Sequence, residues 1–144
     1  MNASDILAAK GANVVTIKQT ASVEQAARVL RERRFGALVV VDAKDAVCGI
    51  ISERDIIRVV SDHGGKALHL RVEDVMTRAV QTCGPGETVQ NVMHIMHKQR
   101  FRHLPVVEDG KLCGLISQTD IIKQQLTQMN EEVRVMHNLN LMRR

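Results

Sequence analysis

The chain of 144 residues is nearly devoid of aromatic side chains, with no Trp, no Tyr and only Phe35 and Phe101. Its core therefore has to be built from Val, Ile, Leu, Ala and Met, and the aromatic platforms on which single-stranded nucleic acids stack are missing. A net charge of +4 and a pI near 9.3 keep a nucleic-acid binder as an alternative. The basic stretches 28–34 and 98–103 are short, however, and typical of solvated helix faces.

Cysteines and long apolar runs are scarce as well. Cys48, Cys83 and Cys113 are odd in number and too widely spaced for a CxxC motif, which disfavours a disulfide framework and indicates a reducing, cytoplasmic environment. No apolar run approaches the roughly 18 residues of a membrane span, and the N-terminus has no signal-peptide pattern. The sequence therefore predicts no membrane partner. His94 and His97 are expected on a helix surface, so we also predict no metal site.

The sequence does contain an internal repeat. An offset of 66 residues places 34–35 on 100–101, and after one deleted residue an offset of 65 places 48–52 on 113–117. The deletion falls where a hairpin turn tolerates it. The chain therefore consists of two homologous units.

Both units show the same order of elements. Ser22 and Thr88 each precede apolar residues at helical spacing, the pattern of an N-cap followed by one buried helix face. The expected elements are strands at 14–17, 37–41 and 47–51 and helices from Ser22 and Glu53 in the first unit, then strands at 80–82, 104–107 and 112–116 and helices from Thr88 and Gln118 in the second. Each unit is β-α-β-β-α, and we expect an α/β (α+β) fold with the two small sheets packed face to face.

The expected domain boundaries follow the repeat. We place the first unit at 1–64, a linker at 65–71, the second unit at 72–130 and a helical tail at 131–144. An apolar stripe at spacings of 3, 4, 3 and 3 runs into this tail, over Leu126, Met129, Val133, Met136 and Leu139. Such a stripe favours packing across a dimer interface, with packing on the chain's own domain as the alternative.

A Gly-x-x-Ser-x-x-Asp motif occurs in both units, as Gly49, Ser52 and Asp55 and as Gly114, Ser117 and Asp120. The glycine is expected to let the strand approach a ligand, and the serine lies at a helix N-terminus that favours phosphate. The aspartate can accept hydrogen bonds from both hydroxyls of a ribose. Serine and aspartate could instead only cap a helix, but duplication of the motif favours a nucleoside phosphate site.

With these motifs, the chain resembles the CBS domain (cystathionine beta-synthase domain) family over roughly residues 5 to 130. The matching segments are 52–57, 72–77 and 102–107 together with the two Gly-x-x-Ser-x-x-Asp motifs. The resemblance implies a tandem pair of β-α-β-β-α units that binds adenosyl ligands in clefts between the sheets.

The resemblance also implies roles for single residues. Asp55 and Asp120 would hold ribose hydroxyls, with Ser52 and Ser117 beside the ribose or phosphate. The adenine would be sandwiched, partly through backbone hydrogen bonds, by Val14, Val15 and Thr16 with Ile50, and by Val80, Gln81 and Thr82 with Leu115. Arg54, Arg102 and His103 would reach phosphates; Gly36, Ala37 and Thr119 stand at the corresponding positions of the other unit, and Phe101 completes the candidate set.

The cations are thus divided between two unequal clefts, of which we expect the one at Asp120 to be better occupied. His103 as a core histidine and Arg102 as a surface charge remain the alternative.

For function, the resemblance implies a stand-alone bacterial regulatory module in signal transduction that is not an enzyme and has no catalytic cofactor. Its ligand would be an adenine nucleotide, with AMP favoured and ADP, ATP or NAD(H) as alternatives, and binding would change the domain or dimer arrangement. The partners would be a second copy, giving a homodimeric disc of four domains, and an unidentified downstream protein. The alternatives are a nucleic-acid-binding CBS protein and a fragment related to IMP dehydrogenase without catalytic activity, since no eight-fold strand–helix barrel fits this length.

Overall fold

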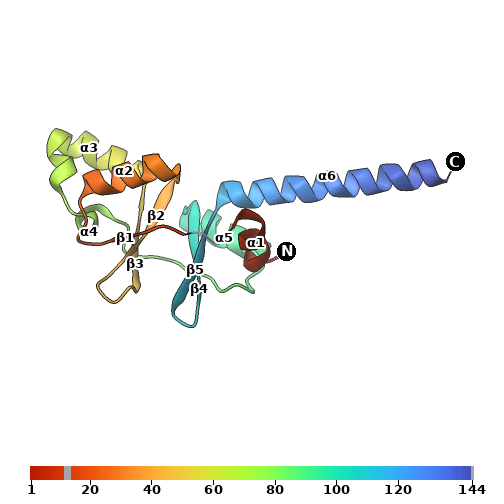
Figure 1. Cartoon of the computed structure of the whole chain (residues 1–144), viewed down its shortest axis with the longest axis horizontal. Helices are drawn as coiled ribbons and strands as arrows, with labels where there is room; N and C mark the ends of the chain where they lie inside the picture. The colour runs from red at the N-terminus through yellow and green to blue at the C-terminus, as the bar shows by residue number, and fades with distance from the viewer. Residues whose placement is uncertain (12–13, 144) are drawn as a thin grey trace.

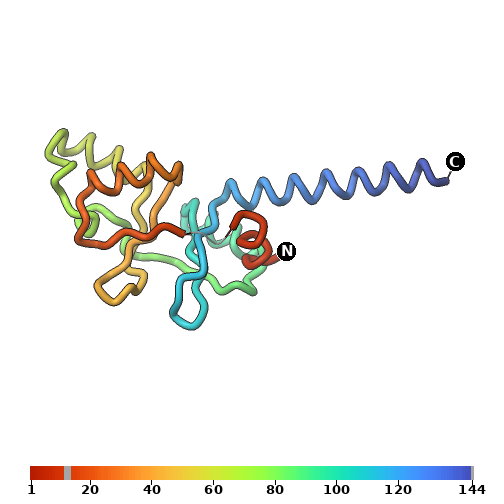
Figure 2. The backbone as a smooth tube through the Cα atoms, viewed as in Figure 1, coloured from red at the N-terminus to blue at the C-terminus, as the bar shows by residue number. Residues whose placement is uncertain are grey.

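The computed structural model describes residues 1–11 and 14–143, arranged as two units with one long helix that projects from the body (Figures 1 and 2). In chain order the elements are α1 (Ala3–Lys10), β1 (Thr16–Lys18), α2 (Val23–Arg33), β2 (Ala37–Val41), β3 (Val47–Ser52), α3 (Glu53–His63), the 3₁₀ helix η1 (Gly64–His69), α4 (Val72–Val75), α5 (Val89–Gln99), β4 (His103–Glu108), β5 (Lys111–Ser117) and α6 (Gln118–Met142). The expected mixed α/β fold of two repeats is confirmed.

The two sheets differ in size. In the first, β1 pairs in parallel with β2, which pairs antiparallel with β3. The second contains only the antiparallel pair β4 and β5. The strand expected at 80–82 is therefore wrong: the chain meets β4 only through a single parallel bridge between Cys83 and Val106, just before the Gly84-Pro85-Gly86 turn. This bridge corresponds, at the offset of 66, to the pairing of Ile17 with Val40 in β1 and β2.

The predicted helix starts are confirmed by their caps. The side chains of Ser22 and Thr88 accept hydrogen bonds from the backbone N–H groups of Gln25 and Asn91 at the starts of α2 and α5. Each of these helices ends on an arginine in the left-handed conformation, Arg34 or Arg100. Helices α2 and α5 therefore begin and end at equivalent positions of the repeat, and each is followed by the equivalent strand, β2 or β4.

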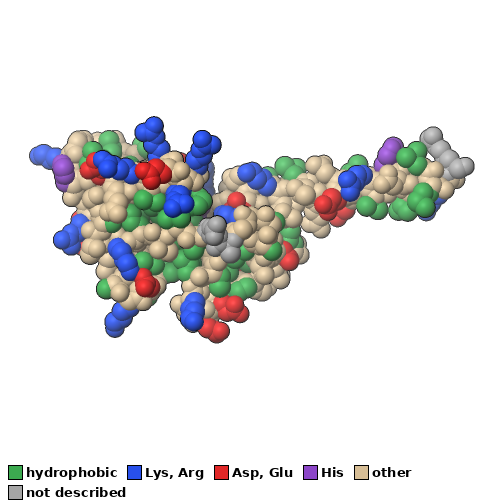
Figure 3. Space-filling model, viewed as in Figure 1, with side chains coloured by type: hydrophobic (Ala, Val, Ile, Leu, Met, Phe, Trp, Pro, Cys, Tyr) green, Lys and Arg blue, Asp and Glu red, His purple; other side chains and the backbone are tan. Residues whose placement is uncertain are grey.

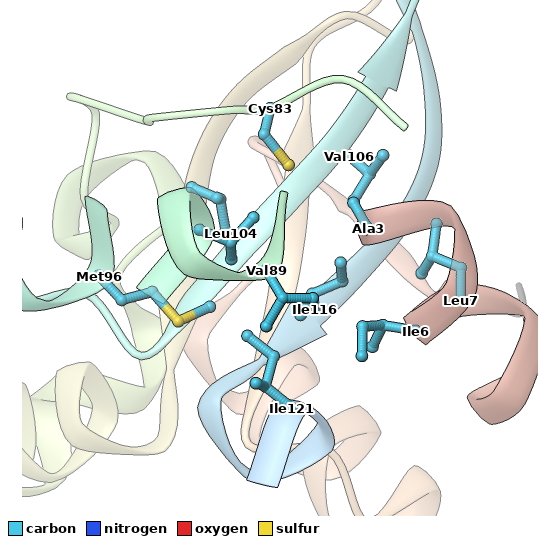
Figure 4. Close-up of a cluster of buried hydrophobic side chains, with 11 residues drawn as sticks. Ala3, Ile6, Leu7, Cys83, Val89, Met96, Leu104, Val106, Ile116 and Ile121 are labelled. Carbon is cyan, nitrogen blue, oxygen red and sulfur yellow. The ribbon is translucent and has the colours of Figure 1, made fainter. Parts of the chain in front are cut away.

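The short helices before each unit are exchanged. The helix α1 precedes the first unit but contributes Ala3, Ile6 and Leu7 to the core of the second, beside Leu104 and Ile116 (Figure 4). Conversely α4 precedes the second unit, and its Val72 packs with Met76 in the core of the first. Each unit is therefore completed by a helix that lies outside its own stretch of sequence.

The segment expected to be a linker is folded. After α3 ends at His63, with the N–H of Gly64 donating to Val60 O, the chain forms η1. Ala67 of η1 is fully buried and packs with Val23 and Val59. The tail expected at 131–144 is the distal part of α6, and its last residue, Arg144, lies outside the described residues.

Within the described residues, no helix is both long and apolar enough to cross a membrane. Cys48, Cys83 and Cys113 are free thiols, Cys83 buried and the other two half-buried. Burial raises the pKa of Cys83 to about 11, so this thiol packs as a small apolar side chain rather than as a thiolate.

Candidate functional site

A cavity of about 760 Å³ lies between the two units, and both Ser–Asp motifs line it. This volume is typical of small-molecule sites. Its walls are formed by Lys10, Arg34, Phe35, Gly36, Ala37, Ile50, Ser52, Glu53, Arg54, Asp55, Arg58, Thr77, Ala79, Val80, Gln81, Arg100, Phe101, Arg102, His103, Leu115, Ser117, Gln118, Thr119 and Asp120. The two clefts expected from the sequence thus open into one continuous space.

Most of the candidate residues are brought together in this cavity, with four exceptions. Val14 and Val15 line a small second pocket, whose other lining residues also line the main cavity: Lys10, Phe35, Ala37 and Leu115. Thr16, in β1, and Thr82, just before the bridge at Cys83, line neither space.

At the first motif, the carboxylate of Asp55 is buried and fully engaged. Its Oδ2 accepts hydrogen bonds from the backbone N–H (2.8 Å) and the hydroxyl (3.1 Å) of Ser52, and so caps α3. Its Oδ1 accepts from Arg58 Nη2 at 2.8 Å. Both carboxylate oxygens of Asp55 are therefore already engaged within the chain, and a ribose would share Oδ1 with the Arg58 guanidinium.

At the second motif, Asp120 caps α6 in the same way but has a different ion-pair partner. Its Oδ2 accepts from the Ser117 N–H at 2.8 Å and from Lys10 Nζ at 2.5 Å. Lys10 also donates to the carbonyl of Leu115 at 2.7 Å. Asp120 Oδ1 accepts from none of the described groups, and it is the carboxylate oxygen of the two motifs that is free for a ligand hydroxyl.

Two ionisable groups here have shifted pKa values. Burial alone would raise the pKa of Asp120, but hydrogen bonds from Lys10 and from the Ser117 backbone, with the Lys10 charge, outweigh burial and hold it below its usual range. Burial, reinforced by Lys10 and Arg102, lowers the pKa of His103 against the opposing effect of Asp120. His103 is therefore neutral and Asp120 ionised at pH 7.

Lys10 was missed by the sequence analysis, because it belongs neither to the duplicated motif nor to the positions that the family resemblance implies. The repeat could have pointed to Lys10, because the α1 segment precedes the first unit as α4 precedes the second, and residues after α4 line the cavity. Ala3 N–H donates to Glu87 O and Val72 N–H to Ala21 O, which equates the two helices. With that alignment, Lys10 corresponds to Ala79, and both line the cavity.

Packing within the chain explains why glycine stands at both motif positions. Neither Gly49 nor Gly114 lines the cavity. A Cβ on Gly49 would overlap Met76 Sδ and lie 3.0 Å from Thr77 O, and one on Gly114 would lie 2.6 Å from Leu7 Cδ2. Glycine is required here because the residues that follow α4, and helix α1, pack directly on β3 and β5.

The backbone hydrogen bonds expected for adenine are partly occupied. Ile50 N–H donates to Thr77 O at 3.0 Å, and Thr77 N–H donates to Ile50 O at 2.9 Å. In the second unit, the carbonyl of Leu115 accepts a hydrogen bond from Lys10 Nζ. The apolar side chains of Ile50 and Leu115 remain on the cavity wall.

The cavity is cationic. Its walls carry six Lys or Arg side chains against the three carboxylates of Glu53, Asp55 and Asp120. The cations are Lys10, Arg34, Arg54, Arg58, Arg100 and Arg102. His103 lies between the sheets, since a Cβ on Gly36 would be 3.2 Å from its Nε2. An excess of positive charge on the walls of one cavity favours an anionic ligand such as a phosphate ester.

Comparison with known proteins identifies the family. The sequence profile of the CBS domain matches residues 3–62 and 72–127, so the chain belongs to the CBS domain family and contains two tandem repeats. The crystal structure of a CBS-domain containing protein from Agrobacterium tumefaciens is 40% identical, with a TM-score of 0.83, and the match covers 86% of this chain and 92% of that one.

Other relatives are longer. A protein of Methanocaldococcus jannaschii is 34% identical over 77% of this chain but only 39% of its own length. An inosine-5'-monophosphate dehydrogenase of Nitrosopumilus maritimus is 33% identical over 76% of this chain and 22% of that enzyme. CBSX2, whose crystal structure was solved in complex with AMP, has a TM-score of 0.69 and 24% identity, over 81% of this chain and 90% of that one, and therefore shows the fold alone.

Proposed function

We propose that this chain is a regulatory module whose central cavity binds an adenine nucleotide. The observation that carries the proposal is that both Ser–Asp pairs and an excess of three positive charges line one cavity of about 760 Å³. Ribose hydroxyls would bind Asp120, phosphates the arginines, and the base the apolar wall near Leu115. AMP is the favoured ligand, with ADP, ATP and NAD(H) as alternatives, and the AMP complex of the similarly folded CBSX2 supports this class.

The module would act by binding alone. Because the ligand would contact both units, it would favour the relative orientation of the units that contacts it best. We assign no catalytic step to the module. The motif aspartates cap helices α3 and α6 and form ion pairs with Arg58 and Lys10. The output would pass to a separate downstream protein.

We also propose that the module forms a homodimer of four CBS units. Ile57 on α3 and Ile122 on α6 occupy equivalent positions and expose 69% and 48% of their surface. Exposed apolar side chains at matching sites of a repeat favour a symmetric contact with a second copy.

The nucleotide proposal is tested by thermal unfolding and calorimetry with AMP, ADP, ATP and NADH at millimolar concentration, with GMP as the base control. A ligand at 100 times its Kd would stabilise the fold by about 2.7 kcal/mol and raise Tm by several degrees. Asp120→Asn should keep the cap on α6 yet weaken binding at least tenfold, whereas Asp62→Asn, at an exposed site on α3, should not. An unchanged Tm with all four adenine nucleotides contradicts the proposal.

A further inference from the structure

The distal part of α6 extends away from the body of the molecule (Figure 1). From Gln125 to Arg143 every residue is exposed, over a length of about 27 Å. Hydrophobic side chains are nevertheless visible along this part in the space-filling view (Figure 3). A helix with no packed face is marginal in water, so this surface needs a partner.

Five of the exposed apolar residues of α6 follow a heptad. Ile122, Leu126, Met129, Val133 and Met136 are separated by 4, 3, 4 and 3 residues, and a further step of 4 reaches Asn140. The alternation of 4 and 3 gives a period of 3.5, which is that of a left-handed coiled coil rather than of a helix lying on a globular body. Leu126, Val133 and Asn140 occupy the a positions, and Ile122, Met129 and Met136 the d positions.

The residues of this stripe are far from buried. Leu126 and Met129 expose 53% and 59% of their surface, and Val133 and Met136 expose 65% each. The stripe begins at Ile122, the residue already proposed at the contact between copies. The exposed surface of α6 is therefore continuous with that contact.

The polar residues give the orientation. With Glu132 at g and His137 at e, a parallel pair of helices places each Glu132 carboxylate beside the partner's His137, whose imidazole N–H can donate a hydrogen bond to it. An antiparallel pair would bring the two Glu132 carboxylates together and Lys123 close to His137. The a-position Asn140 would meet its own copy only in the parallel register, where a buried Asn favours two strands.

We propose that the distal half of α6 forms a parallel two-stranded coiled coil with the same helix of a second copy. The proposal rests on the homodimer proposed above and names the contact that holds it, and it is independent of the nucleotide. The signal of the central cavity could then reach α6 directly, because Ser117 and Asp120 form the cap of this helix.

The test compares Met129→Glu with Gln128→Glu, which add the same charge at neighbouring exposed positions of α6. Mass in solution is measured by light scattering with refractive-index detection, since the chain lacks Trp and Tyr. Met129→Glu should raise the dimer dissociation constant at least tenfold, while Gln128→Glu should leave it unchanged. A dimer that both variants preserve overturns the coiled coil but not the homodimer, and a monomeric wild-type protein overturns both.

Orientation is tested by oxidative cross-linking. Asn140→Cys should form an intermolecular disulfide, and Asn138→Cys, on the outer face of the same turn, should give only the background of the wild-type cysteines. If Met129→Glu weakens the dimer but Asn140→Cys gives no cross-link above that background, the parallel orientation is overturned.

Discussion

Lys10 and Lys18 each form an ion pair with an aspartate at 2.5 Å, but the surroundings of the pairs differ. The side chains of Lys10 and Asp120 are 28% and 19% exposed, whereas those of Lys18 and Asp45 are 53% and 80% exposed. Lys10→Met should lower the free energy of unfolding by about 1 to 2 kcal/mol, and Lys18→Met by less than about 1 kcal/mol. The free energies of unfolding are measured by urea titration followed by circular dichroism. Equal losses for the two variants would contradict the prediction that the Lys10 pair is the stronger one.

His103 should make stability depend on pH. Its pKa in the folded protein lies below the ordinary 6.5 because of burial and of nearby Lys10 and Arg102. As the pH falls below about 6.5, the unfolded chain takes up a proton that the folded chain resists, so stability is complete above this pH and is lost as the pH falls through the folded pKa. The free energy of unfolding should therefore fall more steeply between about pH 7 and 5 in the wild type than in His103→Gln. The control variant is His63→Gln, which removes an exposed histidine instead of the half-buried one.

Sequence reasoning found Asp55 and Asp120 because the motif is duplicated, and it missed Lys10 because no local pattern links residues 110 positions apart. Arg58 lies three residues after Asp55 on the same helix, so that pair was accessible to helical-spacing arguments. The pairing of Lys10 with Asp120 instead depends on where α1 lies in space.

Gly49 and Gly114 hold the exchanged segments against the strands. Gly49→Ala should cost about 1 to 3 kcal/mol of unfolding free energy, because the Thr77 backbone beside it cannot move aside. Gly114→Ala should cost less, since its neighbour is the flexible end of Leu7. Gly84→Ala is the control, with nothing within 4 Å of the added methyl group and no positive φ. Combining Gly114→Ala with Leu7→Ala should be less than additive, and additive costs would show that the two residues do not meet.

At the level of helices and strands, the sequence predicted most elements because Ser22, Ser52, Thr88 and Ser117 mark helix starts unambiguously. The strand expected at 80–82 failed because extended residues form a strand only where a neighbour pairs with them. The chain before Cys83 instead runs along the cavity, where Val80 and Gln81 contribute to the wall.

The exchange of α1 and α4 couples the stability of the two units, because each core contains residues from the other side of the chain. Ile6 is 1% exposed in the core of the second unit, so Ile6→Ala should cost about 2 to 5 kcal/mol while a single transition is kept. Leu68→Ala, at a position of η1 that is 37% exposed, should cost less than Ile6→Ala. Hydrogen exchange should accelerate in β4 and β5 before β2 and β3. The opposite order would mean that α1 does not close the second unit.

The crossed helices α1 and α4 have a consequence for ancestry. A chain of half this length, with one leading helix and one unit, could complete its core only by exchanging that helix with a second chain. Duplication and fusion of such a gene would convert the exchange between chains into an exchange within one chain and leave each helix beside its present core. The pseudo-symmetric cavity would then be the former contact between two identical polypeptides, and its unequal halves, Arg58 on one aspartate and Lys10 on the other, would be what diverged after fusion.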